Sequence, residues 1–567
     1  MIGPLPMPAN PSAKVFRAGS LIYSKKGLFI LFAWMLWGDF CFTLMEAVVP
    51  SILPLKLRSL GSANVLIGFV MTTLPGIFNF TVTPWLSFKS DRHRSRWGRR
   101  RPFILMTMPF LTLSLIFIGF SHEIGVWVHA HMFSGNIVSQ TTVIIVLLAI
   151  FAAMFDLFNM FVNTVYWYLF NDIVPIDCMG RFMALFRLVS TVTTAGYNFF
   201  IFRYAESHMR EIFLGAALLY LIGFGAMLLR VKEGEYPDPV DDGNRVGLIG
   251  KIRIFSRECF SMRYYWDIFL TNTLVAMSMT IGVFGIFFNK SLGLSLDQIG
   301  KMAAISAITV PVCFLFAGSL VDRWNPVRVS TYVLVNSVIT GLGAWVWIFV
   351  AAPPPMVYVW IGVITSAVFG APLSALSQTA EMTRLMRLLP REQYGQFSGA
   401  LAMVRALAVM VGGVLAGLWV DFWRGFYGDE FAYRFNFLYK EILILFAFYF
   451  YYRTYRAWKL LGGDTGYEAP KEGFSLANLK PRPGADNRVY WGLVGVVTFS
   501  VLGQMLAQGT WVVYYTWYEP NRHHATIFSV ALMLSLVLYG LYVLIIRHLE
   551  RPPRDPQGPA NAIVGSP

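Results

Sequence analysis

Long apolar runs separated by short polar segments dominate this chain. A membrane-spanning helix needs about 20 mostly apolar residues, and about fourteen such runs occur along the sequence. They lie near 28–54, 64–88, 103–121, 142–170, 182–202, 212–230, 266–289, 298–321, 328–351, 356–382, 396–420, 437–455, 491–513 and 526–547. The pattern predicts an all-α polytopic membrane protein.

The polar segments predict how these helices are grouped. The longest interruption before the C-terminal region, 231–265, divides the first twelve spans into two groups of six. We therefore expect an N-terminal segment 1–27, a six-helix half 28–230, a central loop 231–265, a second six-helix half 266–455, a linker 456–490, two additional helices 491–547 and a tail 548–567. The additional helices are either a hairpin that packs on the bundle or faces a partner, or, as the simpler interpretation, a lipid-facing appendage.

Two short motifs recur at equivalent places in the two halves. Pro175-x4-Gly180-x-Phe182 follows the fourth span, and Pro390-x4-Gly395-x-Phe397 follows the tenth. Asp91-Arg92 after the second span recurs as Asp322-Arg323 after the eighth. Parallel halves of this kind place a substrate site between them, near the middle of the bilayer.

Composition and charge agree with a membrane protein. The chain is 56% hydrophobic and 14% charged, with a formal net charge of +15. Its Lys and Arg residues lie in short segments between apolar runs, as in cytoplasmic loops, and this distribution does not favour nucleic-acid binding. Because the basic segments alternate along the chain, we expect a multi-pass protein of the cell membrane with both termini in the cytoplasm. The four cysteines are scattered and predict neither a disulfide framework nor a metal site.

Charged residues inside the spans are the first functional candidates, because each costs about 3 kcal/mol at the centre of a bilayer. Asp156 lies near the middle of the fourth span and is the preferred proton-binding residue. Asp39 and Glu46 in the first span are further coupling candidates, or form a structural ion pair or a polar contact with another helix. Arg187 could pair with Asp156, bind a substrate oxygen, or extend toward the cytoplasm. The remaining two, Glu381 and Arg405, suggest a gating pair or a mutual salt bridge.

Amide and aromatic side chains within the spans suit a neutral polyhydroxyl ligand, because amides bind hydroxyls and rings bind the C–H faces of sugars. Helix contacts are the alternative explanation for each one. Together with Arg187, the substrate-binding candidates are Asn159, Asn163, Tyr166, Trp167, Tyr197, Asn198, Asn272 and Gln378.

The loop 89–102 contains seven basic residues around one acid, Asp91. Its guanidinium groups are costly at a helix start unless carboxylates or helix C-termini receive them. Contacts that form when the cytoplasmic face is shut and break when it opens would make a gate. The predicted gate residues are Asp91, Arg92, Arg96, Gly98, Arg99, Arg100, Arg101, Asp322 and Arg323.

The spelling of this loop resembles a known family. The tract Pro84-x5-Ser90-Asp91-Arg92-x2-Ser95-Arg96-x-Gly98-Arg99-Arg100-Arg101-Pro102 is similar to the same loop of sucrose transporters, within the major facilitator superfamily. Residues 94–98 also resemble the melibiose permease, one of the glycoside–pentoside–hexuronide cation symporters. The resemblance implies a major facilitator fold of two six-helix halves, here with two extra C-terminal helices.

The resemblance also extends to Asp156-Leu157-Phe158-Asn159, which is similar to the sucrose-transporter tract whose Asp is taken to bind the proton. Two departures matter. The arginine that the family has eleven positions further on is Trp167 here, which weakens the case for sucrose itself. The two acids of the cation site of the melibiose permease correspond to Asn79 and Thr83, which favours protons over sodium.

These observations predict a secondary active transporter, a proton-coupled symporter of a sugar or glycoside that works by alternating access. The alternatives are a uniporter or exporter of another small polar metabolite, and a non-transporting sensor or scaffold with the same fold. Because no catalytic motif occurs in the sequence, we expect no enzyme activity. We expect no cofactor or metal apart from a coupling cation, H⁺, and as partners a small-molecule sugar and the lipid bilayer.

Overall fold

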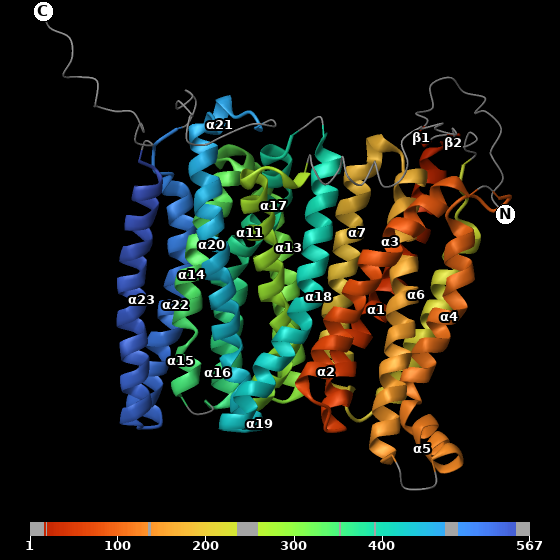
Figure 1. Ribbon diagram of the computed structural model, residues 1–567, viewed down its shortest axis with the longest axis horizontal. Coiled ribbons are helices and arrows are strands. Elements are labelled where there is room, and N and C mark those ends of the chain that lie inside the picture. The colour runs from red at the N-terminus through yellow and green to blue at the C-terminus, as the bar shows by residue number, and fades with distance from the viewer. Residues whose placement is uncertain are drawn as a thin grey trace, which may run out of the picture. The chain divides into compact units, whose positions relative to one another are not determined.

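The computed structural model describes residues 16–18, 20–93, 95–133, 138–234, 259–350, 353–390, 393–470 and 486–551, which form mostly long helices (Figure 1). Most of the expected central loop and C-terminal tail, and parts of the N-terminal segment and the linker, lie outside these residues. The described chain forms two compact units. The first comprises Met1–Gly243, Leu294–Ile308 and Met410–Phe422, and the second comprises Asn244–Gly293, Thr309–Val409 and Trp423–Pro567. The units differ from the expected halves in that 294–308 and 410–422 belong to the first unit.

The N-terminal part of the chain forms a short hairpin and six long helical stretches, some of them interrupted by π or 3₁₀ turns. The hairpin pairs β1 (Phe16–Ala18) with β2 (Leu21–Tyr23). The helical elements are α1 (Lys25–Ser59), α2 (Asn64–Gly68), η1 (Phe69–Thr73), α3 (Leu74–Arg92), α4 (Arg101–Gly119), α5 (Ser121–Met132), α6 (Gln140–Ile173), α7 (Ile176–Gly196), η2 (Tyr197–Ile201), η3 (Phe202–Tyr204), α8 (Met209–Leu219), η4 (Tyr220–Phe224) and α9 (Gly225–Arg230).

The C-terminal part also forms long helical stretches, some of them interrupted by π or 3₁₀ turns. Its elements are α11 (Arg263–Met279), η5 (Thr280–Phe284), α12 (Gly285–Ser291), α13 (Leu296–Trp324), α14 (Pro326–Gly343), α15 (Val346–Phe349), α16 (Pro355–Val363), η6 (Ile364–Gly370), α17 (Ala371–Leu388), α18 (Tyr394–Tyr427), α19 (Asp429–Ala432), η8 (Tyr433–Phe435), α20 (Asn436–Leu460), α21 (Gly463–Gly466), α22 (Trp491–Val513), η10 (Tyr514–Tyr518) and α23 (Arg522–Leu549).

Twelve helices in the described residues are long and apolar enough to cross a membrane, so the chain is a multi-pass membrane protein. The expected spans 182–202 and 437–455 are also helical, in α7–η2 and α20, but they are not among the twelve. Polar residues explain this difference, since α20 carries Lys440, Glu441, Arg453 and Arg456. Two further elements differ from expectation: helix α5 occupies part of the expected loop 122–141, and the hairpin β1–β2 lies in the expected N-terminal segment.

The two additional helices, α22 and α23, are not a loose lipid-facing appendage. Both pack on α14 (Figure 1), and α22 also packs on α17 and η6. Val497 and Tyr542, which are fully buried, share one hydrophobic core with Tyr332 of α14 and Ala380 of α17. Buried Gln508 of α22 accepts a hydrogen bond from Ser535 of α23 at 2.9 Å. The sequence pattern could not predict this docking, because an apolar helix looks the same whether it faces protein or lipid.

Candidate functional site

Two acidic residues of α1 are the starting point of the site. Asp39 and Glu46 are seven residues apart, about two helical turns, and therefore lie on one face of α1. Asp39 is only 1% exposed. Its carboxylate accepts hydrogen bonds from the hydroxyl of Thr43 at 3.3 Å and from that of Ser190, on α7, at 2.9 Å. Asp39 thus makes a polar contact with another helix, one of its two predicted roles.

Glu46 joins α1 to α6 through two of the predicted amides. Its Oε1 accepts hydrogen bonds from Nδ2 of Asn159 at 3.3 Å and from Nδ2 of Asn163 at 3.2 Å. The two asparagines are four residues apart, so they lie on one face of α6 and can bind the same oxygen. Three residues that the sequence singled out separately are therefore brought together inside the first unit.

Asp156 lies on α6 three residues before Asn159, on the same face of the helix. Its side chain is partly buried. Among the residues that the structure describes, no hydrogen-bond or ion-pair partner is found for its carboxyl group. A carboxyl group in this position can exchange a proton without first breaking a salt bridge.

The aromatic candidates of the first unit differ in their accessibility. Tyr166 is buried, and its hydroxyl donates to the carbonyl oxygen of Met35 at 3.1 Å. The hydroxyl of buried Tyr197 lies 2.6 Å from that of Ser51 on α1. Trp167, in contrast, is 41% exposed. Tyr166 and Tyr197 therefore hold helices together here, while the ring of Trp167 contacts Phe170 and Phe186 but stays partly accessible.

In the described structure, two other candidates of the first unit make no contact with Asp39, Glu46, Asp156 or the two asparagines. Arg187 is exposed on α7, and none of the described residues forms an ion pair with it. Asn198 is partly buried in η2, and its backbone carbonyl lies against Gly300. The pairing of Arg187 with Asp156, one of the alternatives predicted for this arginine, is therefore not observed.

The two residues that replace the acids of the melibiose permease are also placed. Asn79 is exposed on α3, and the hydroxyl of Thr83 contacts the sulfur of Met160 at 3.3 Å. Neither supplies a carboxylate oxygen, the ligand that a hard cation prefers.

The second unit contains an arginine that the sequence analysis missed. Arg384 is 8% exposed, donates to Oδ1 of Asn272 at 2.6 Å and lies 5.2 Å above the ring of Tyr451. It lies just beyond the expected span 356–382, but α17 extends to Leu388 and carries it inside the unit. Its pairing with Asn272 means that this candidate amide already has a protein partner.

Three predicted residues of the second unit are exposed. Gln378 donates to the hydroxyl of Ser374 at 3.1 Å. Glu381 and Arg405 approach each other to 3.8 Å, and each side chain is about half exposed. Their contact is the mutual salt bridge that was the simpler prediction.

Three arginines of the loop 89–102 are bound by carboxylate and carbonyl groups of other elements. Asp172, at the end of α6, accepts hydrogen bonds from Arg99 at 2.5 and 3.0 Å and from Arg100 at 3.2 Å. Arg100 also donates to the hydroxyl of Ser90 at 2.6 Å. Nε of Arg101 donates to the carbonyl oxygen of Leu228 at the end of α9, at 2.9 Å.

A second carboxylate, Glu233, caps the N-terminus of α4. It accepts from the backbone N–H groups of Arg99, Arg100 and Arg101 at 2.8, 3.1 and 2.6 Å. A negative charge at a helix N-terminus is favourable, because it satisfies unpaired N–H groups and the helix dipole. Sequence reasoning did not single out Glu233, since a lone acid after a span carries no motif.

For the other predicted gate residues, the structure describes only some of the side chains. Asp91 and Arg92 end α3, but their side chains lie outside the described part of the structure. Arg96 is exposed in the loop, and Asp322 and Arg323 are exposed at the end of α13.

Comparison with known proteins covers most of the chain at the level of the family. The family model "Major Facilitator Superfamily" matches residues 35–413. Sucrose transport protein SUT1 of Oryza sativa subsp. japonica is 39% identical over 79 residues, which is 14% of this chain and 14% of that relative. Sequence similarity to the curated relatives thus spans only a small part of their length.

Solved structures resemble the fold. A mutant of the nucleoside transporter NupG aligns with a TM-score of 0.55 and 14% identity, over 74% of this chain and 99% of that chain. A D-xylose–proton symporter aligns with a TM-score of 0.53 and 14% identity, over 74% and 97% of the two chains. At this identity the similarity concerns the fold alone.

Proposed function

This chain belongs to the major facilitator superfamily, and we propose on that premise that it is a proton-coupled symporter of a sugar or glycoside. The family consists of transporters rather than enzymes. One observation carries the proposal: the helices α1 and α6 of the first unit carry three acidic residues, Asp39, Glu46 and Asp156, and Glu46 accepts hydrogen bonds from the amides of Asn159 and Asn163.

Proton coupling is supported by the contacts of these acids. Asp39 and Glu46 are hydrogen-bonded to neutral hydroxyl and amide groups, without a described arginine or lysine beside them. A carboxyl group placed among neutral donors within a membrane-spanning helix can be neutral in one state of the cycle and charged in another. Asp156 is the preferred carrier, because no described partner competes with the proton.

A sugar substrate is supported by two independent features. The 79-residue similarity to a protein named as a sucrose transporter is the first. The second is the chemistry around the acids, where Asn159 and Asn163 offer amide groups and Trp167 offers an exposed ring. Substrate hydroxyls that bind these amides would change the environment of Glu46, and this shared contact would couple substrate and proton.

The arginine-rich loop supports a gating role. Asp172 and Glu233 hold Arg99, Arg100 and Arg101 within the first unit. In our proposal these residues exchange partners as the cytoplasmic face opens and closes, in the way that alternating access requires. We further propose that the protein resides in the cell membrane with both termini in the cytoplasm, on the side of the basic loops.

Uptake by proteoliposomes tests the proposal. We expect the protein to accumulate a labelled sugar, drawn from a panel that includes sucrose, under an inward proton gradient. Asp156→Asn should abolish accumulation but preserve counterflow, because exchange of substrate needs no net proton movement. Asp297→Asn, which removes a partly exposed acid that pairs with Lys301, is the matched control and should transport normally.

Other outcomes would favour the rival functions. Accumulation driven by sodium instead of protons would contradict the reading of Asn79 and Thr83. Transport without any gradient dependence would indicate a uniporter or exporter. Ligand binding without counterflow in the same vesicles would indicate a sensor or scaffold.

A further inference from the structure

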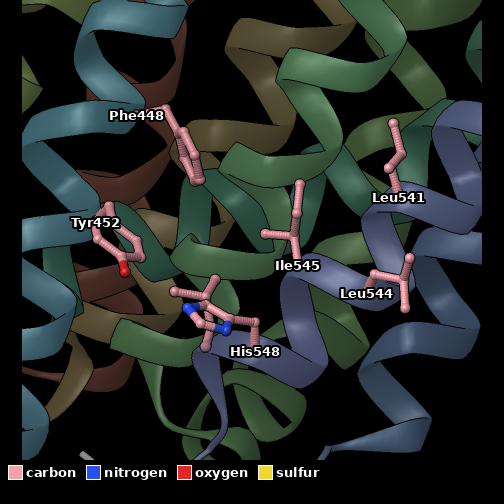
Figure 2. Close-up of a pocket in the computed structure, with 7 residues that line it drawn as sticks. Phe448, Tyr452, Leu541, Leu544, Ile545 and His548 are labelled. Carbon is pink, nitrogen blue, oxygen red and sulfur yellow. The ribbon is translucent and has the colours of Figure 1, made fainter.

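A groove of about 330 Å³ runs between α20 and α23 (Figure 2). Both helices pack on α14, which holds them on the same side of the second unit. The wall from α20 consists of Phe448 and Tyr452. The wall from α23 consists of Leu541, Leu544, Ile545, His548 and Leu549. One wall therefore exists only because the chain has helices beyond the two six-helix halves.

Hydrogen bonds join the ends of the two helices next to Leu549, one of the residues that line the groove. The hydroxyl of Tyr455 donates to Oε1 of Glu550 at 2.8 Å. Nζ of Lys459 donates to the carbonyl oxygen of Leu549 at 3.1 Å and to Oε2 of Glu550 at 3.4 Å. These bonds fix the ends of α20 and α23 relative to each other, so the groove is a built feature with a defined end.

Three basic side chains occur on α20, on α23 and just after α23, in the region of this end of the groove. The guanidinium group of Arg456 lies 5.7 Å above the ring of Tyr452, one turn further along α20, and its side chain is exposed. Figure 2 shows the ring of His548 extending from α23 toward Tyr452. Arg551 follows His548 by three residues and is exposed. His548 thus lines an otherwise apolar groove, Arg456 lies over the ring of the lining residue Tyr452, and Arg551 follows just after the lining residue Leu549 in the chain.

Glu550 lies in the same region but does not neutralise these basic side chains. Glu550 is 1% exposed and is bound by Arg328 at 2.5 Å and by Lys459 on the inner side of the unit. Arg456 and Arg551, the exposed charged side chains described above, are both positive, while the groove is lined mostly by aliphatic and aromatic carbon.

We propose that this groove binds one anionic glycerophospholipid. An acyl chain lies along Phe448, Leu541, Leu544 and Ile545, because burying its methylene groups is favourable. The phosphate lies at Arg456, His548 and Arg551, since basic pockets between transmembrane helices recognise acidic headgroups. The inference does not rest on sugar transport, so either proposal can fail without the other.

Native mass spectrometry of the full-length protein in neutral detergent tests this inference. We expect phosphatidylglycerol to be retained at least about 5-fold more strongly than phosphatidylcholine with the same acyl chains. Arg456→Gln should lower phosphatidylglycerol retention by about 5-fold, which corresponds to the loss of one basic group near a headgroup. The matched control is Arg203→Gln, which removes another exposed arginine that lies above a tyrosine ring, 4.7 Å from the centre of Tyr204. It should have no effect.

Filling the groove provides the second arm. Leu544→Trp places a large side chain on its wall and should lower phosphatidylglycerol retention about 10-fold while every basic group remains. Elution at the wild-type volume in size-exclusion chromatography verifies that this variant is folded. Inorganic phosphate at millimolar concentration should not displace the lipid, because most of the contact is made by the acyl chain.

Three outcomes would overturn the proposal. One is equal retention of the two phospholipids. Another is an equal loss in Arg456→Gln and Arg203→Gln, which would indicate unspecific charge attraction. The third is displacement by inorganic phosphate together with no effect of Leu544→Trp, which would indicate an anion site without a lipid.

Discussion

Gly98, in the arginine-rich loop, has little freedom to change. Its φ of +99° is a conformation that other residues adopt only with strain. A Cβ atom at this position would lie 2.6 Å from the carboxyl carbon of Glu233, which caps α4. We predict that Gly98→Ala lowers the free energy of unfolding by about 1–2 kcal/mol or more. Thermal unfolding of the solubilised protein measures this loss.

Gly399→Ala is the matched control for that measurement. Gly399 lies in α18, and a Cβ atom there would meet no other atom within 4 Å. Alanine is favoured over glycine inside a helix, so the control should be unchanged or slightly more stable. Equal thermal stability of the two variants would show that Gly98 is not required for the cap by Glu233.

Asp464, in α21, predicts how stability depends on pH. Burial raises the pKa of Asp464, but the hydrogen bonds and charge of Arg328 outweigh this effect and lower the pKa below its ordinary value of 3.8. A carboxyl group whose folded pKa is depressed stabilises the protein above its unfolded pKa, and this contribution is lost as the pH falls through the folded pKa. The midpoint of thermal unfolding should therefore fall as the pH drops below about 4.

Asp464→Asn removes the titrating group and tests this assignment. The variant should be less stable than the wild type at pH 7 and should lose less stability between pH 5 and pH 3. Parallel curves for the two proteins over this range would assign the acid sensitivity to other carboxylates.

Individual residues of the candidate site were predictable, but their partners were not. Asp39, Glu46, Asp156, Asn159 and Asn163 stand out in the sequence, because polar groups inside apolar spans are costly. Nothing in the sequence joins Glu46 to Asn159, since they are more than 100 positions apart. Arg384 and Glu233 were missed because each lies at the border between a helix and a basic loop, where charge is ordinary.

At the level of elements, the start of α2 depends on a residue far along the chain. Oδ1 of Asp421, on α18, accepts from the backbone N–H and from Nδ2 of Asn64 at 3.1 and 2.8 Å. Its Oδ2 accepts from the N–H of Val65 at 2.8 Å. Because the N-cap residue Ala63 provides no side-chain hydrogen bond to this helix, we predict that Asp421→Ala costs about 1–2 kcal/mol. Amide hydrogen exchange should become faster at residues 64–66.

Asp429→Ala removes an exposed acid close to the end of the same helix, where it pairs with Arg424, and serves as the control. Surface pairs of this kind contribute little, so exchange at residues 64–66 should not change. Unchanged exchange in Asp421→Ala as well would mean that packing alone holds α2 in place.

Element positions were largely predictable, whereas irregularities within them were not. Apolar runs of about 20 residues located the helices because each span must satisfy its own backbone hydrogen bonds in lipid. The π-helical turns η1 and η2 occur within such runs, and helix α5 occurs in an expected loop. Turns of this kind depend on how neighbouring helices pack, which an apolar pattern does not encode.

For the molecule as a whole, one buried charge network joins the end of α23 to α14 and α20 within the second unit. Arg328 is fully buried and forms ion pairs with Glu550, which directly follows α23, and with Asp464 in the linker. Lys459 also binds Glu550. We predict that Glu550→Gln lowers the free energy of unfolding by about 3 kcal/mol, because buried Lys459 and Arg328 each lose an ion-pair partner. The midpoint of thermal unfolding measures this change.

Glu519→Gln changes an exposed acid of the same two-helix segment and is the control. It should leave the midpoint within about 1 °C of the wild type, because surface substitutions away from buried features have small effects. A similarly small change in Glu550→Gln would mean that hydrophobic contacts alone attach α22 and α23.

The sequence by itself determined the membrane-spanning helices, their division into two halves and the arginine-rich loop. Each of these depends on local physical chemistry, the cost of placing polar groups in lipid and of leaving charges without partners. Only the tertiary structure decided which carboxylates receive the arginines, how Glu46 meets its amides, and that the last two helices are part of the second unit. Such choices join residues far apart in the chain, so the geometry of the folded protein determines them.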